Sequence, residues 1–185
     1  GSVAVRFGAA YPELTRGRVL VDGGFIERSK DVTWEQAERE MRPPDIDGTP
    51  VERFKQFMRQ WPNLRDLWTD ELGEMVLYNF EVRDQKIYRR LSIPNHMKIA
   101  RAIFEQRASE LLPQVKCPVL IIPALREPGS EDERRWQEYR ERGIAAIQEA
   151  RPNVEVRPML DSIHDVPIQR PQELADAIAE FAAKL

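Results

Sequence analysis

His164, one of only two histidines in the chain, is the residue best suited to acid–base chemistry. It lies in the segment LDSIHDVP, at the end of a predicted strand over residues 153–160. Carboxylates follow the two other predicted strands: Asp22 ends the run RVLVD, and Glu127 comes after the run CPVLIIPA. A carboxylate that accepts a hydrogen bond from one imidazole nitrogen leaves the other nitrogen free to act as a base. The positions therefore predict that His164 and several carboxylates, which also include Asp161 and Asp165, meet at one edge of the sheet, where an acid–base pair can form.

Three short runs predict the strands that must position these groups. Residues 18–22 and 117–124 are apolar on both faces, which is typical of buried parallel strands, whereas residues 153–160 alternate more and suit a strand nearer an edge. Helical sequence lies between the strands, so we expect an α/β fold with a parallel sheet and right-handed crossovers. In such sheets ligands bind beyond the carboxyl ends of the strands, where His164 and these carboxylates are expected.

Between the first two strands lies a long section, residues 25–115, that reads as almost all helix. Within it, residues 82–91 (VRDQKIYRRL) are compatible with a hairpin or an extended loop. After the second strand, Ser130 and Glu133 form a capping box for a charged helix. The run of charges from Glu131 to Arg142 is interpreted as a solvated helix face with i,i+4 pairs.

Composition excludes several classes of function. Hydrophobic residues make up 42% of the chain and charged residues 32%, so the chain can bury a sizeable core. A net charge of −3 without a basic block argues against nucleic acid as a partner. No apolar run approaches the roughly 18 residues of a membrane span, so no membrane partner is expected, and a cytoplasmic setting is the default.

The same composition limits cofactor chemistry. The one cysteine, Cys117, excludes an internal disulfide and a cysteine-rich zinc site. The sequence contains neither a histidine cluster nor a glycine-rich phosphate loop. We therefore expect no metal and no organic cofactor.

Three segments together resemble the C-terminal part of the α/β-hydrolase superfamily. VAVRFGAAYPELTRGRVLVDGGF resembles the helix after that family's nucleophile elbow and its sixth strand. CPVLIIPALREP resembles the strand and loop that carry the catalytic acid, and LDSIHDVPIQRPQELADAIAEF resembles the catalytic-histidine loop and closing helix. The resemblance implies the last three strands of a hydrolase sheet. It also implies core segments at residues 1–24 and 116–185, with residues 25–115 as an inserted all-helical cap.

The resemblance also implies roles for individual residues. His164 matches the family's general base, and Glu127 lies where the acid usually follows the seventh strand, although the family more often has Asp there. Asp22 is the alternative acid, because some members take it from the end of the sixth strand; we favour Glu127. Residues of the middle section most often serve in ordinary packing. The functional alternative is that some of them line a substrate pocket. The candidate substrate-binding residues are Phe25, Trp61, Trp68, Tyr78 and His96.

The chain departs from the family at the nucleophile. The family's elbow reads G-x-S-x-G, and no serine of this chain lies in such a motif. We therefore expect the nucleophile on a missing N-terminal half or on a second chain. It follows that residues 1–185 alone are expected not to hydrolyse esters.

The favoured function is cleavage of a carboxylic ester or lactone of a small molecule by a serine-type hydrolase, with His164 as the general base. An upstream Asp nucleophile would instead give an epoxide hydrolase or a dehalogenase, through an alkyl-enzyme ester. The third interpretation is a non-catalytic α/β domain that works by association, since a sheet cut at its first strand leaves an open edge.

Overall fold

The computed structural model describes residues 1–151 and 153–185. It divides into two compact units. The first unit consists of Gly1–Thr33 and Ile103–Leu185, and the second of Trp34–Ala102.

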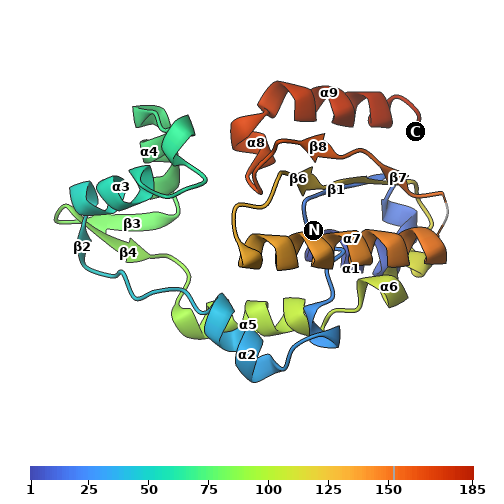
Figure 1. The fold of residues 1–185 in the computed structure, drawn as a ribbon, viewed down its shortest axis with the longest axis horizontal. Helices are drawn as coiled ribbons and strands as arrows, with labels where there is room; N and C mark the ends of the chain where they lie inside the picture. The colour runs from blue at the N-terminus through green and yellow to red at the C-terminus, as the bar shows by residue number, and fades with distance from the viewer. Residues whose placement is uncertain (152) are drawn as a thin grey trace. The chain divides into compact units, whose positions relative to one another are not determined.

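The first unit contains a parallel sheet (Figure 1). Its strands are β1 (Arg18–Val21), β5 (Val119–Ile122) and β7 (Glu155–Val156), in the order β1-β5-β7. A short parallel pair, β6 (Ala124–Leu125) and β8 (Met159–Leu160), follows β5 and β7 along the chain. The predicted α/β fold with a parallel sheet is confirmed.

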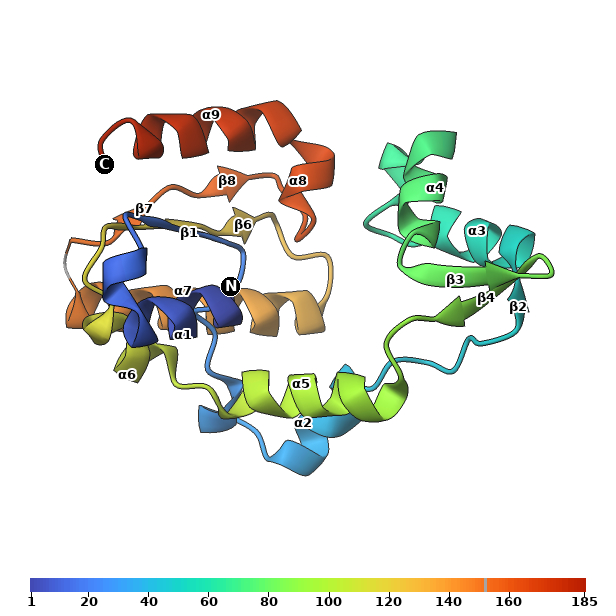
Figure 2. The same cartoon turned by 180° about the vertical axis from the view of Figure 1, so that it is seen from behind.

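Helices cover both faces of this sheet. On one side lie α1 (Ser2–Ala10), α6 (Ala108–Leu111) and α7 (Glu131–Ala150). On the other side lie α8 (Val166–Gln169) and α9 (Pro171–Ala182), an arrangement visible from the front and from behind (Figures 1 and 2). Two layers of helices around one sheet are the usual way to bury a parallel sheet.

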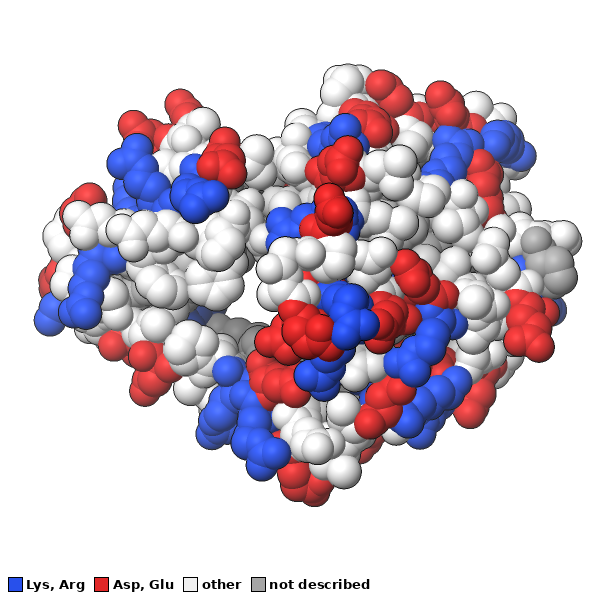
Figure 3. Space-filling view, in the orientation of Figure 1, with Lys and Arg blue, Asp and Glu red and all other residues white. Residues whose placement is uncertain are grey.

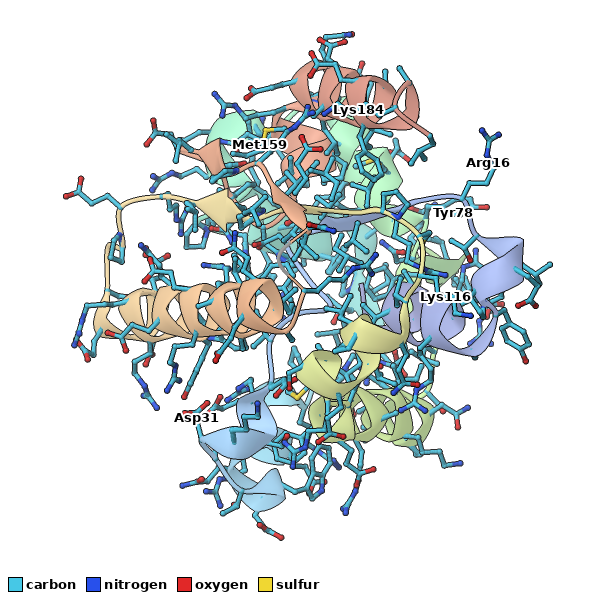
Figure 4. The ribbon with its side chains drawn as sticks, turned by 90° about the vertical axis from the view of Figure 1, so that its right-hand side faces the viewer. Arg16, Asp31, Tyr78, Lys116, Met159 and Lys184 are labelled. Carbon is cyan, nitrogen blue, oxygen red and sulfur yellow. The ribbon has the colours of Figure 1, made fainter. Side chains whose placement is uncertain are left out.

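The strands divide their side chains between two core clusters because successive residues of a strand point to opposite faces. Leu20, Val119 and Ile121 belong to the cluster that also contains Val5 of α1 and Ile147 of α7. Leu120, Ile122 and Met159 belong to the cluster that contains Leu174 and Phe181 of α9. Figure 4 shows Met159 on the side of α9. Every residue of β5 is buried, which explains its uninterrupted apolar sequence.

The second unit combines helices with a small antiparallel sheet. Its elements are α2 (Trp34–Met41), β2 (Thr49–Pro50), α3 (Val51–Arg59), α4 (Asp70–Leu77), β3 (Phe80–Arg83) and β4 (Lys86–Arg89). The helix α5 (Ile93–Glu105) crosses the boundary between the units. Its residues up to Ala102 belong to the second unit, and those from Ile103 onward belong to the first. Short 3-10 helices occur at Pro12–Leu14, Arg28–Lys30, Arg65–Leu67 and Leu112–Gln114.

The middle section is therefore not all helical, which corrects that part of the expectation. The strands β3 and β4 form the hairpin that was one of the two alternatives for residues 82–91, and β2 pairs with β4. Asp84 and Gln85 turn the chain between them with φ angles of 49° and 56°. Two consecutive positive φ angles give the turn that matches the twist of a hairpin. Without an Asn-Gly or Asp-Gly pair, the sequence signals this turn only weakly.

The second unit is shorter at both ends than the section 25–115 predicted from the sequence. Its role as a cap stays a prediction. Among the residues that the structure describes, no helix is long and apolar enough to cross a membrane.

Candidate active site

The candidate site lies where β1 ends, in the first unit. Asp22 follows β1 directly, and its backbone has a φ of 41°, in a region that residues other than glycine rarely adopt. The next two residues are glycines, and the backbone of Gly1 lies so close to Gly23 and Gly24 that a β-carbon on Gly1 or Gly24 would overlap. The first turn of α1 therefore packs on the turn that carries Asp22.

The carboxylate of Asp22 joins the ends of three strands. Nδ1 of His164, in the loop after β8, lies 2.7 Å from Oδ2 of Asp22. The backbone N–H of Ala124 in β6 donates to Oδ1 over 3.0 Å. The Asp22 side chain is 1% exposed, whereas that of His164 is 65% exposed. A buried carboxylate thus holds an imidazole whose other nitrogen is left for a substrate or nucleophile.

The hydrogen bond with Asp22 raises the pKa of His164 above its usual 6.5, and the partial burial of the ring opposes this rise. The charge of Asp165 also raises the pKa of His164, whereas the charge of Arg140 lowers it. In the neutral ring, the tautomer that donates Nδ1–H to Asp22 leaves Nε2 unprotonated and able to accept a proton. The pair can therefore perform general base catalysis.

Arg140 of α7 completes the surroundings of the carboxylate. Its Nε lies 3.2 Å from Oδ1 of Asp22, and its side chain is 20% exposed. The other arginines near it on α7 form exposed ion pairs, such as Arg134 with Glu138, within a surface of interspersed acidic and basic side chains (Figure 3). Arg140 is not among the site residues predicted from the sequence, because it stands in that charged run, where no feature of spacing distinguishes it.

Glu127, the acid that the sequence favoured, makes no hydrogen bond or ion pair with His164 among the described residues. Its side chain is exposed, and within residues 1–151 and 153–185 it has no hydrogen bond or ion pair. Its neighbour Arg126 pairs with Glu133 of α7. The backbone N–H of Gly129 lowers the pKa of Glu133, with Arg126 contributing in the same direction. The structure thus brings His164 together with Asp22, the alternative acid, and not with Glu127.

The candidate substrate-binding residues fall into two groups. Phe25 is 0% exposed and packs in the core cluster with Leu112 and Val5, so its side chain has no surface for a substrate. The other four belong to the second unit. There Trp61 and Tyr78 are exposed, and Trp68 and His96 are half-buried.

Among the described residues, no group of three or more His, Cys, Asp or Glu side chains could hold a metal ion.

At the level of sequence, no protein-family model matches the chain and no curated protein is similar to it. Solved structures are similar in fold. One is E-2-(acetamidomethylene)succinate hydrolase, at 18% identity and a TM-score of 0.69, covering 97% of this chain and 62% of that protein. Another is a carboxylesterase of the ammonia-oxidizing thaumarchaeon Nitrososphaera gargenis, at 16% identity and a TM-score of 0.63, covering 98% and 60%.

A third is a peroxisomal α/β-hydrolase of Saccharomyces cerevisiae, at 11% identity and a TM-score of 0.64, covering 98% of this chain and 49% of that protein. The chain therefore has the α/β-hydrolase fold, and it spans less than two thirds of the length of these three proteins.

Proposed function

We propose that this chain supplies the general base and its acid partner to a hydrolase that cleaves a carboxylic ester or lactone of a small molecule. The observation that carries the proposal is the 2.7 Å contact between Nδ1 of His164 and a carboxylate oxygen of the buried Asp22. The α/β-hydrolase fold supports it, because hydrolases and a carboxylesterase share that fold.

In the proposed reaction, Nε2 of His164 removes the proton from a serine hydroxyl as the oxygen attacks the carbonyl carbon. His164 then donates that proton to the departing alcohol oxygen, and an acyl-enzyme remains. In the second half, His164 activates water in the same way and the acid product leaves. Asp22 keeps the imidazole in the required tautomer and stabilises the imidazolium that forms in each step.

We propose that the nucleophile belongs to a segment outside residues 1–185 or to a second chain. Two features of the first unit support this. Among the described residues β1 pairs with β5 on one side and with no strand on the other, so its outer edge can accept a further strand. The N-terminal end of α1 packs on Gly23 and Gly24, which follow Asp22, so a residue preceding α1 would be close to the acid–base pair.

We further propose that the second unit acts as a cap that selects the substrate. Trp61 and Phe57, whose ring centroids are 5.6 Å apart, give it an exposed aromatic surface, and Tyr78 is also exposed. Exposed aromatic side chains in a group commonly mark binding surfaces. Phe25 has no part in this proposal because it is buried.

The test is hydrolysis of p-nitrophenyl esters and of a simple lactone by the complete protein, with His164→Ala as the variant and Arg142→Ala, at an exposed residue that pairs with Asp31, as the control. Loss of a triad histidine should reduce kcat by at least about 10³-fold, whereas Arg142→Ala should retain turnover. Undiminished turnover by His164→Ala would contradict the proposal.

Residues 1–185 alone should show no turnover. Turnover by these residues alone, abolished in His164→Ala, would put the nucleophile within them. Activity on an epoxide or a haloalkane instead of esters would indicate an Asp nucleophile. Absence of all these activities in the complete protein would favour a domain that works by association.

A further inference from the structure

We propose that Arg140 is a positioning residue of this site: it holds the Asp22 carboxylate with Oδ2 toward His164 and limits how strongly that carboxylate stabilises the imidazolium. The consequence for catalysis rests on the proposed function, whereas the effect on the imidazole itself does not. Arg140 touches Asp22 and acts on His164 through it.

The two oxygens of Asp22 have separate partners. Oδ1 faces the backbone N–H of Ala124 at 3.0 Å and Nε of Arg140 at 3.2 Å. Oδ2 faces Nδ1 of His164 at 2.7 Å. Because a carboxylate can rotate about its terminal bond, one donor on Oδ1 leaves its plane poorly defined, and a second donor from a different element fixes it. Arg140 thereby aligns Oδ2 with the imidazole.

Burial distinguishes this ion pair from the others on α7. The side chains of Asp22 and Arg140 are 1% and 20% exposed, whereas Arg134 and Arg135 of the same helix are about half exposed in their pairs. Exposed pairs contribute little because water screens them, but a charge within a largely desolvated group acts strongly on its neighbours. The positive charge of Arg140 therefore acts on the Asp22 carboxylate and, through that carboxylate, on His164.

The position of Arg140 follows from a backbone contact. Gly143 of α7 lies so close to the carbonyl group of Phe25 that a β-carbon there would overlap the oxygen. Arg140 is one helical turn before Gly143, and Asp22 is three residues before Phe25. The close approach of the helix to this turn thus brings the guanidinium to the carboxylate.

The charged groups that act on His164 are Asp22, Asp165 and Arg140. Asp22 and Asp165 favour the protonated ring, and Arg140 opposes them. Near Arg140 on α7, Glu133 is engaged by Arg126 and by the N–H of Gly129. Without Arg140, the imidazole would face two carboxylates with no opposing cation of its own. It would then stay protonated to higher pH, which is the inactive form for a general base.

The experiment is an NMR titration of the histidine Cε1–H signals of the 185-residue chain, with no substrate present. The variants are Arg140→Met, Arg140→Lys and the control Arg142→Met. Arg142 lies on the same helix and pairs with Asp31, away from the Asp22 carboxylate. The signal of His96, the other histidine, serves as an internal reference. A His96→Gln variant assigns the two signals.

Arg140→Met should raise the pKa of His164 by roughly 0.5–1 unit, since it removes the cation that contacts the carboxylate paired with this partly exposed ring. Arg140→Lys keeps the charge but not the planar Nε, so the rise should be smaller. Arg142→Met should leave the pKa of His164 unchanged.

An unchanged or lowered pKa of His164 in folded Arg140→Met would overturn the proposal. If that variant does not fold, Arg140→Lys is decisive alone, and a pKa equal to that of the unchanged protein overturns the proposal. Because no substrate is used, the result is independent of whether the complete protein is an esterase. If the complete protein is an esterase, the acid limb of its kcat/KM profile should move to higher pH. The shift should be largest in Arg140→Met, smaller in Arg140→Lys and absent in Arg142→Met.

Discussion

Gly143 of α7 lies against the carbonyl group of Phe25 with no room for a β-carbon between them. This contact joins the longest helix of the first unit to the turn after β1. It brings the side chain of Arg140 to Asp22, at the same turn that holds His164 through a hydrogen bond. A backbone contact in the core thus determines which charged side chain of an otherwise exposed helix enters the site.

The contact predicts the effect of Gly143→Ala. A methyl group at this position meets a backbone oxygen, which cannot rotate away, so α7 must shift. Overpacking of this kind costs about 1–3 kcal/mol, although Ala gains up to about 1 kcal/mol of helix propensity over Gly. We expect a net loss in the free energy of unfolding by urea, together with a raised pKa of His164 as Arg140 moves away.

Gly129→Ala is the control for this substitution. A β-carbon there would meet only the end of the flexible Glu133 side chain. The free energy of unfolding should change by less than about 0.5 kcal/mol. Equal stability of Gly143→Ala and the unchanged protein would mean that the helix does not depend on this contact.

Asp22→Asn and Glu127→Gln test which carboxylate supports His164. The amide introduced by Asp22→Asn could still accept from the N–H of Ala124 but would favour the wrong imidazole tautomer. The corresponding change in the serine-protease triad lowers kcat about 10⁴-fold, and we expect a loss of at least about 10²-fold in the complete protein. Glu127→Gln should leave kcat within about twofold, since Glu127 is exposed and forms no hydrogen bond with His164 or Asp22 among the described residues. A large loss in Glu127→Gln alone would restore the acid that the sequence favoured.

The sheet and its helices could be predicted from the sequence because their signals are local. Residues 119–122 are apolar on both faces and every one is buried. Ser130 accepts from the N–H of Glu133 as its capping box predicts, and α7 begins there. The position of His164 after a strand could also be predicted from the sequence.

The partner of His164 could not be predicted in the same way. The choice between Asp22 and Glu127 depends on the path of the chain after each strand. Asp22 has a left-handed backbone and the next two residues pack against Gly1, and neither feature can be inferred from the composition. Arg140 could not be distinguished in the sequence from the other charged residues of α7. Only the close packing of α7 against Phe25 distinguishes it from them. The roles proposed for the second unit stay predictions.

The hairpin of the second unit allows a test that is independent of the site. Gln85 lies in the turn between β3 and β4, and its backbone φ of 56° is in the left-handed region. This costs about 1 kcal/mol for a residue other than glycine. Gln85→Gly should raise the free energy of unfolding by roughly 0.5 kcal/mol, the relief being partly offset by the greater freedom of glycine when unfolded. Gln85→Val, with a β-branched side chain, should lower it, and the opposite order in urea unfolding would contradict the turn.

His164 also couples stability to pH. Its pKa in the folded chain is raised above 6.5, first by the hydrogen bond with Asp22, so the folded state binds this proton more tightly than the unfolded state. The resulting stabilisation is fully present below the unfolded pKa of about 6.5 and is lost as pH rises through the higher folded pKa.

Because the side chain is 65% exposed, we expect this contribution to be at most about 1 kcal/mol. Urea unfolding of the unchanged chain and of His164→Gln, compared between about pH 5 and 9, measures it directly. The advantage of the unchanged chain should be larger at the acid end and shrink toward the alkaline end. His96→Gln provides the control. An advantage that stays constant with pH, or grows toward alkaline pH, would mean that Asp22 does not hold the protonated imidazole in the folded chain.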